Sequence, residues 1–138
     1  NKIGKVLIQT YYPNQPVIQS FKNRDRKSFV EQSLRERQQF NIPPFGYMTA
    51  IIISSSSKAR AESYSQALIK GSNSNSSIDF LGPVEAPLFL LRGRYRYRIL
   101  LKGTKRSMLN NFTRHMIEKT PPSSNLRLTV DVDPYTFM

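Results

Sequence analysis

The residues with the clearest chemical potential form the run RGRYRYRILLK at positions 92–102, in which arginine and tyrosine alternate. Alternate residues of an extended chain point to opposite sides. One side of such a strand would carry cations, at Arg94, Arg96, Arg98 and Lys102. The other side would carry Tyr95, Tyr97, Ile99 and Leu101, which suits a core. The cationic side could bind phosphates or simply face water, and the alternation allows both interpretations.

Basic residues are concentrated around this run, because seven arginines and lysines and no acid fall within residues 92–106. They are Arg92, Arg94, Arg96, Arg98, Lys102, Lys105 and Arg106. The whole chain of 138 residues carries a formal net charge of +12. An excess of this size favours nucleic acid or an acidic protein surface as the partner. Arginines and tyrosines could also stack on unpaired bases, but these tyrosines share their side with aliphatic residues and are expected in the core.

A second basic site is expected where a helix begins after this strand. Thr104 has the residue type of an N-cap, and Lys105 and Arg106 would then occupy the first helical turn. Cations there oppose the helix dipole at a cost of about 0.3–1 kcal/mol each, and a docked anion would reverse that cost. Arg106 and Asn110 lie four residues apart and could clasp a carboxylate or phosphate together. Screening of these charges by water and salt is the alternative.

Catalytic and metal-binding groups are sparse. The sequence has no cysteine, a single histidine at His115 and no phosphate-binding loop of the G-x-x-x-x-G-K-[ST] type. Asp131 and Asp133 are two residues apart in a β-prone run and could share a face that holds Mg²⁺. We favour the alternative, in which they offset nearby arginines or end the strand, because nothing else completes a metal site. No catalytic or metal-binding residue is assigned.

Strands and helices are expected in an order that would position these residues. β-prone runs cover residues 4–10, 47–54, 78–81, 84–91, 95–101 and 126–132. Helical patterns cover residues 25–40, 57–70 and 104–117, and Asp25 and Ser57 suit their N-caps. Gly82-Pro83 interrupts one strand, Gly93 suits a hairpin turn, and residues 71–77 are typical of a loop. No apolar run is long enough to span a membrane, and no membrane partner is expected.

From residue 47 onward the expected order is β-α-β-β-α-β. This α+β order is that of split β-α-β, ferredoxin-like domains, in which both helices pack on one side of an antiparallel sheet and form a sandwich. The other side of the sheet would be free to bind, as in RNA-recognition domains of this topology. Each helix would turn an apolar stripe inward. The stripes are Ala61, Tyr64, Ala67 and Leu68, and then Leu109, Phe112 and Met116.

Four stretches together resemble a known family. They are GKVLIQTYYPNQPVIQ at 4–19, LRERQQFNIPPFGYM at 34–48, LGPVEAPLFLLRGRYRYRILLKG at 81–103 and DVDPYTF at 131–137. In this order they are similar to the C-terminal part of the PriA family of bacterial replication-restart helicases, also named primosomal protein N′. LGPVxAP, RGRYR and DVDP are specific as a set, although each is weak alone. The serine- and asparagine-rich residues 54–57 and 72–77 depart from the family pattern.

The resemblance implies a division of the chain. Residues 1–19 would be the end of the second helicase lobe, with 4–10 as a remnant strand, and residues 20–138 would be the C-terminal domain. The fold of that domain is similar to that of a small ribosomal-subunit protein, here preceded by a surface helix. The first residue, Asn1, is not methionine, which agrees with a piece of a longer protein.

The resemblance also implies a function. The family's enzyme is an ATP-dependent 3′-to-5′ DNA helicase of the bacterial cytoplasm that restarts stalled replication forks by primosome assembly. Its ATP, Mg²⁺ and Zn²⁺ sites lie upstream, so no cofactor is expected in this chain. The implied partners are branched or single-stranded DNA, the acidic tail of the single-strand-binding protein and other primosome proteins.

Two groups of residues are assigned to these partners from face and charge. DNA contact is assigned to Arg92, Arg94, Arg96, Arg98 and Lys102. Docking of the acidic tail is assigned to Lys105, Arg106 and Asn110. Two other functions stay open: a stand-alone RNA- or ribosome-associated domain of the same topology, and a metal-dependent nuclease that uses Asp131 and Asp133.

Overall fold

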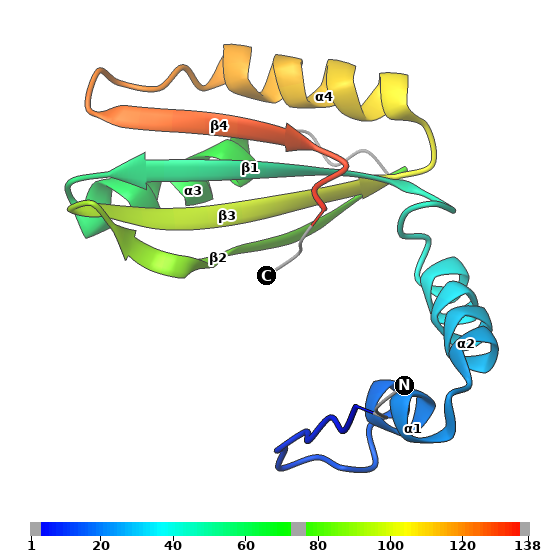
Figure 1. The fold of residues 1–138 in the computed structure, drawn as a ribbon. Coiled ribbons are helices and arrows are strands. Elements are labelled where there is room, and N and C mark those ends of the chain that lie inside the picture. Colours follow the sequence, from blue (N-terminus) through cyan, green and yellow to red (C-terminus); the bar gives the residue numbers. More distant parts are fainter. Residues whose placement is uncertain (1–3, 73–76, 136–138) are drawn as a thin grey trace. The chain divides into compact units, whose positions relative to one another are not determined.

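The structure is a computed structural model that describes residues 4–72 and 77–135 (Figure 1). The chain divides into two compact units, residues 1–36 and residues 37–138. The described helices before the sheet begin at Pro16, and the second unit contains the sheet. Residues 73–76 of the predicted loop lie outside the described residues. No helix in the described part of the chain is long and apolar enough to cross a membrane.

The first unit contains α1 (Pro16–Asn23) and most of α2 (Arg26–Gln39). Asp25 caps α2 as predicted, because its Oδ1 accepts a hydrogen bond of 3.0 Å from the backbone N–H of Ser28. The same N–H stabilises the charged carboxylate and lowers the pKa of Asp25. α2 contains no buried residue, so the predicted surface helix is confirmed.

The start of the chain differs from the sequence-based expectation in two places. The described residues 4–10 form no strand, because a strand needs a hydrogen-bonded neighbour and they pair with none of the described strands. α1 is absent from the sequence-based prediction, although Pro16 suits a first helical position, where no backbone donor is needed. Arg24 ends α1 in the left-handed region, with φ 55°.

The second unit has the predicted β-α-β-β-α-β order. Its strands are β1 (Tyr47–Ser55), β2 (Ile78–Leu91), β3 (Arg94–Gly103) and β4 (Leu126–Val132), and its helices are α3 (Lys58–Gly71) and α4 (Arg106–Lys119). The four strands pair in the order β2-β3-β1-β4, and every pair is antiparallel. This arrangement confirms the α+β, ferredoxin-like fold.

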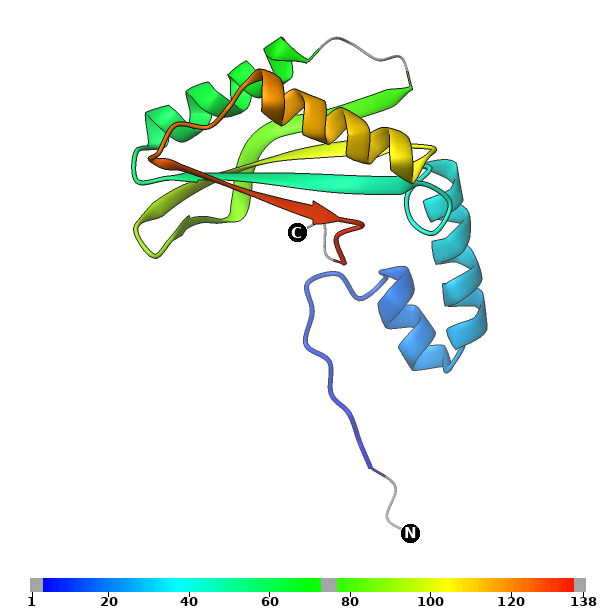
Figure 2. The ribbon, with the colours of Figure 1, turned by 90° about the horizontal axis from the view of Figure 1, so that it is seen from above.

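One side of the sheet is covered by α3 and α4 (Figure 2). Alternate residues of β1 and β3 are fully buried against these helices, and they are Ile51, Ile53, Ile99 and Leu101. From the helices, Leu68, Leu109 and Met116 close the same core. Tyr97 belongs to this core and is 5% exposed, so the predicted division of the RGRYRYR strand into a core side and a cationic side is confirmed.

The inward stripes of the two helices differ in part from the prediction. On α3, Ala61 and Leu68 are buried as expected, but Ala67 is exposed and Ser65 takes the inner position. Ser65 tolerates burial because its hydroxyl donates to the carbonyl of Glu62 at 2.7 Å. Ser57 caps α3 as predicted by accepting a hydrogen bond from the backbone N–H of Arg60.

β2 and β3 are joined by a tight turn and paired irregularly. Arg92 and Gly93 both have positive φ, at 50° and 72°. A two-residue hairpin turn of type I′ requires positive φ at both of its central residues. The register of β2 shifts between Leu81 and Val84, so the predicted interruption is confirmed inside one continuous strand. Gly82 has φ 103°, and a Cβ there would lie 2.8 Å from the carbonyl oxygen of Arg98. Only glycine therefore allows β2 to follow β3 at this point.

The side of the sheet away from the helices, here called the open face, is not entirely free as predicted. At one end Met48, Ala50 and Leu100 are buried on it, and Ile42 packs against them. The Lys102 ammonium donates to the carbonyl of Phe40 at 3.2 Å and helps to hold that segment. The end near the β2–β3 turn stays accessible.

Candidate nucleic-acid interface

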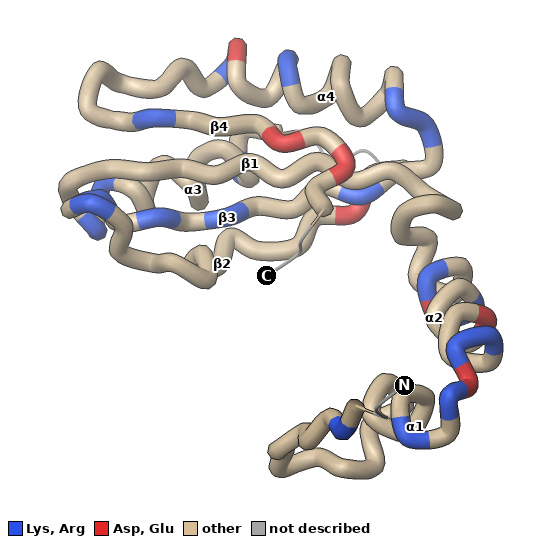
Figure 3. The backbone as a smooth tube through the Cα atoms, viewed as in Figure 1, with Lys and Arg blue, Asp and Glu red and all other residues tan. Residues whose placement is uncertain are grey.

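Basic residues meet on the open face near the β2–β3 turn (Figure 3). In the strand register Ser54 of β1 lies between Arg96 of β3 and Arg127 of β4. One step further along, Ile52 lies between Arg98 and Thr129. The pairing order of the sheet thus joins the RGRYR strand to an arginine that is about 30 residues away in sequence.

A hollow of about 540 Å³ lies at this end of the open face. Four arginines line it, and they are Arg92, Arg94, Arg96 and Arg127. Ser54, Ser56 and Thr129 add hydroxyl groups, and no acidic side chain lies among the described lining residues. Guanidinium and hydroxyl donors without a competing carboxylate suit a phosphate ligand.

Arg94 is fixed by the domain itself. Its Nη2 donates to the carbonyl of Ser54 at 2.8 Å and to the carbonyl of Asn125 at 3.1 Å, and its Nε lies 3.4 Å from the Ser54 hydroxyl. These bonds tie β3 to β1 and to the segment before β4. Arg94 therefore contributes positive charge from a fixed position, while several of its donors are already used.

The other arginines keep their donors. Arg92, Arg98 and Arg127 make no side-chain hydrogen bond or ion pair with any residue that the structure describes, and Arg96 makes one long contact of 3.5 Å with the carbonyl of Leu88. We call Arg92, Arg96, Arg98 and Arg127 the open-face arginines. Three of them were predicted as site residues. Arg127 was not, because it stands alone in LRLTVDV and only the sheet register brings it to the site.

Lys102 does not join this group, although it lies on the same strand. Its ammonium pairs with Asp79 Oδ2 at 3.1 Å as well as with the Phe40 carbonyl, and its side chain is 21% exposed. Lys102 is therefore already paired within the domain at the covered end of the open face, and its DNA contact stays a prediction.

The second predicted basic site, at the start of α4, is arranged differently from the prediction. Thr104 is not the N-cap: Lys105 occupies that position, and its side chain makes no capping bond. Arg106 is the first helical residue and pairs with Asp133 at 2.6 Å, with its guanidinium carbon 5.3 Å from the centre of the Tyr47 ring. Asn110 is exposed on α4. The charge of Arg106 is thus offset within the domain.

The two aspartates considered for a metal site are separated by the end of β4. Asp133 lies just beyond the strand with φ 49°, and its Oδ1 accepts a hydrogen bond from the backbone N–H of Met48 at 3.1 Å. The expectation that it ends the strand and offsets an arginine is confirmed. Within residues 4–72 and 77–135, no group of three or more histidine, aspartate or glutamate side chains could hold a metal ion. His115 is exposed on α4.

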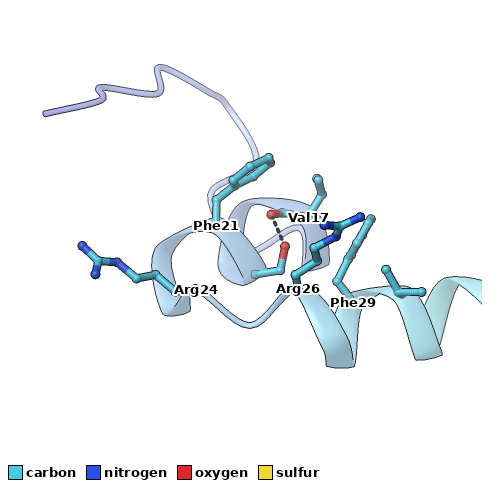
Figure 4. A pocket seen from close by; sticks show the side chains of 7 residues that line it. Val17, Phe21, Arg24, Arg26 and Phe29 are labelled. Atoms are coloured by element: carbon cyan, nitrogen blue, oxygen red, sulfur yellow. Dashed lines mark hydrogen bonds between the residues drawn. The ribbon is translucent and has the colours of Figure 1, made fainter. Parts of the chain in front are cut away.

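The first unit has a hollow of its own, of about 430 Å³, between α1 and α2 (Figure 4). Its walls are largely apolar, with Val17 and Phe21 from α1 and Phe29 from α2. Arg24 and Arg26, on either side of the turn between the helices, complete the lining. No pair of catalytic groups lies there, so this hollow adds no chemistry to the site on the sheet.

Comparison with known families now places the chain. The model of the primosomal protein N C-terminal domain matches residues 38–135, which include the whole sheet and all the open-face arginines. The chain belongs to this family. The resemblance seen in the four sequence stretches is therefore confirmed.

Similar proteins of several bacteria are named replication restart protein PriA. Replication restart protein PriA of Rickettsia conorii is 29% identical over 134 residues, which cover 97% of this chain and 20% of that protein. The protein of the same name from Bacillus subtilis is 26% identical over 142 residues, covering 99% of this chain and 18% of that protein. The chain thus spans about a fifth of the length of these relatives. Their similarity supports membership of the replication restart protein family.

Proposed function

We propose that this domain binds DNA through the open face of its sheet, as part of a replication-restart protein. The observation that carries the proposal is the cluster of open-face arginines, three of which line a hollow that has no acidic side chain among its described lining residues. Cations that form no ion pair with the described residues are available to replace the counterions of a phosphate backbone, and the release of those counterions favours binding. The relatives named replication restart protein PriA support DNA as the polyanion.

The geometry favours binding of a single DNA strand along the sheet over insertion of a helix into a groove of duplex DNA. Arg96 and Arg98 are two residues apart on β3, so their side chains emerge about 6.6–6.8 Å apart along the strand. This spacing resembles that of consecutive phosphates along an extended nucleic-acid strand. The two helices packed on the sheet, α3 and α4, lie on its opposite side, so neither can enter a major groove from the open face.

The proposal is tested by binding single-stranded and forked oligonucleotides over a salt series, measured by fluorescence anisotropy. The test variant changes Arg92, Arg96, Arg98 and Arg127 to Gln, which removes the charges and keeps polar side chains. The matched control changes Arg60, Lys70, Arg114 and Lys119 to Gln, because these exposed residues of α3 and α4 carry the same total charge. The proposal predicts that the test variant loses most of its affinity and that its salt slope falls by about 3. Equal losses in both variants would contradict it.

The family also suggests functions of the whole protein and further partners. A longer protein containing this domain would be the ATP-dependent 3′-to-5′ helicase of a primosome in the bacterial cytoplasm, with ATP, Mg²⁺ and Zn²⁺ bound outside this chain. Unwinding of a forked substrate by such a longer protein, with and without the four Gln substitutions, tests whether the open face serves that activity.

Docking of an acidic protein tail, such as that of a single-strand-binding protein, is our second proposal for the domain. Its support is the exposed Lys105 at the N-cap of α4, together with Asn110, which is exposed on the same helix. Arg106 would contribute less than its charge suggests, because Asp133 already pairs with it. Titration with an acidic peptide, in the parent chain and in Lys105→Gln, tests this proposal, which fails if the substitution leaves the affinity unchanged.

A further inference from the structure

A second, smaller hollow of about 220 Å³ opens on the same face next to the open-face arginines. Its floor is Ala50 and Ile52 of β1. One wall is the irregular part of β2 from Ala86 to Leu88, and the opposite wall is Pro134, which follows β4. Ala86 and Pro134 are buried, so the walls are part of the folded domain. The hollow is therefore a preformed slot whose lining combines apolar residues with three charged ones, Arg96, Arg98 and Asp131.

Three charged residues line this slot, Arg96 and Arg98 from β3 and Asp131 from β4, and the aspartate forms no ion pair with either arginine. Asp131 of β4 lies in register with Ala50, and Arg98 of β3 lies in register with Ile52, so β1 separates their strands. The two backbones are thus about two strand spacings, or roughly 9.6 Å, apart. Neither side chain makes an ion pair or hydrogen bond with a residue in the described part of the chain. Acceptors on one side and donors on the other are left available.

These groups specify the chemistry of a ligand. A simple anion would be attracted by Arg96 and Arg98 and repelled by Asp131, and a simple cation would be attracted by Asp131 and repelled by both arginines. A flat, neutral group with N–H donors on one edge and a carbonyl acceptor beside them would satisfy both side chains and place its faces against apolar walls. A nucleobase has this form.

We infer that this slot, formed by Asp131, Arg98 and the apolar residues between them, binds one unpaired base of the DNA strand. The inference rests on the proposed function, because the phosphates of the same strand would lie on the open-face arginines. Guanine fits best, since its adjacent N1–H and N2–H groups can donate to the Asp131 carboxylate while its O6 accepts from Arg98. A base in a duplex has this edge already paired, so the slot selects single-stranded DNA.

The experiment compares two oligomers with the same number of phosphates. One is a 12-unit strand of abasic tetrahydrofuran sites, and the other is the same strand with a single guanine at its centre. Binding of each to the full chain is measured by anisotropy at one salt concentration. We expect the guanine strand to bind at least about fivefold more tightly, which is the lower end of the effect of one stacked base.

Substitution of Asp131 is the decisive test, because the two roles that this residue could have predict different effects on the affinity for DNA. If Asp131 accepts from the base, Asp131→Ala abolishes the preference for the guanine strand, and Asp131→Asn weakens it. If Asp131 is only a negative charge near a phosphate track, Asp131→Ala raises the affinity for both strands equally. Glu118→Ala is the matched control, because Glu118 is an exposed carboxylate on α4 without a partner among the described residues. It should change neither affinity by more than about twofold.

The outcomes separate this inference from the proposal on which it rests. Equal, salt-dependent binding of both strands would overturn the base slot and leave the phosphate track standing. A guanine preference that survives Asp131→Ala would also overturn the slot. No binding of either strand, together with no binding of ordinary single strands, would overturn both. Competition by free dGMP at the concentrations at which the guanine strand binds would show a free-nucleotide site and overturn the assignment to a DNA base.

Discussion

The two basic regions of this domain look alike in sequence and differ in structure. The open-face arginines make at most one long hydrogen bond with the described residues, whereas two neighbouring cations are engaged: Arg106 at the start of α4 by Asp133, and Lys102 on β3 by Asp79 and the Phe40 carbonyl. The comparison teaches that a local density of arginine and lysine does not measure the charge available to a partner. What counts is whether the fold brings an acid or a carbonyl to each cation.

The largest expected effect comes from reversing the charge of two open-face arginines, and the same change on α4 serves as the comparison. Arg98→Glu with Arg127→Glu should lower the affinity for single-stranded DNA by about a hundredfold or more, because two attractions become two repulsions. Lys105→Glu with Lys119→Glu, which changes the net charge equally at the two ends of α4, should lower it less than about fivefold. Anisotropy titrations at fixed salt measure both. Similar losses would mean that only total charge matters, and the distinction between the regions would disappear.

Asp133→Ala should produce the next largest effect, and on stability rather than binding. It removes the acceptor of the Met48 N–H and the partner of Arg106, and we expect the free energy of unfolding to fall by about 2 kcal/mol. Urea denaturation measures this change. Asp131→Ala removes a carboxylate two residues away that has no partner among the described residues, and it should cost under about 0.5 kcal/mol. Equal costs would show that the Asp133 contacts contribute nothing specific.

Tyr64→Phe tests the helix side of the domain, which we expect to stabilise the fold without binding DNA. The Tyr64 hydroxyl donates to the Thr120 carbonyl at 2.6 Å, so its loss should cost about 1 kcal/mol and leave DNA affinity unchanged. Burial raises the pKa of Tyr64 above its ordinary value. The contribution of the neutral phenol is therefore complete below about pH 10 and is lost as the pH rises through the folded-state pKa. Unfolding curves from pH 8 to 11 should fall less steeply for Tyr64→Phe than for the parent.

The smallest expected effect is that of Asp79→Asn, which releases the Lys102 ammonium from its ion pair. The pair is partly exposed, so the free energy of unfolding should change by less than about 1 kcal/mol. DNA affinity should rise by no more than about twofold, because Lys102 still donates to the Phe40 carbonyl. A rise of tenfold or more would show that Lys102 belongs functionally with the open-face arginines.

Much of the fold could be predicted from local patterns. Alternation in β3 and helical spacing in α3 and α4 identified the elements and most of the core, because one buried side per element imposes a period of two or 3.6 residues. The failures have local causes too. Residues 4–10 have the composition of a strand but pair with no described strand. Thr104 has a residue type that favours the N-cap, but Lys105 occupies the N-cap position of α4. Cap geometry depends on the backbone angles of one residue, which composition does not determine.

The candidate site could be predicted only in part. Arg92, Arg96 and Arg98 were identified from their own strand, but Arg127 and the Asp131 slot depend on β4 pairing with β1 beside β3. The same pairing order brings Asp133 to Arg106 and so removes one predicted cation from the available charge.

The sequence by itself determined the elements, their order, the excess of positive charge and the family, because each of these is carried by residue types and spacing along the chain. Only the tertiary structure decided which cations remain available and which carboxylate lines the same slot as they do. The physical reason is that hydrogen bonds and ion pairs act over a few ångströms, and the distances between residues far apart in sequence are set when β4 takes its place at the edge of the sheet.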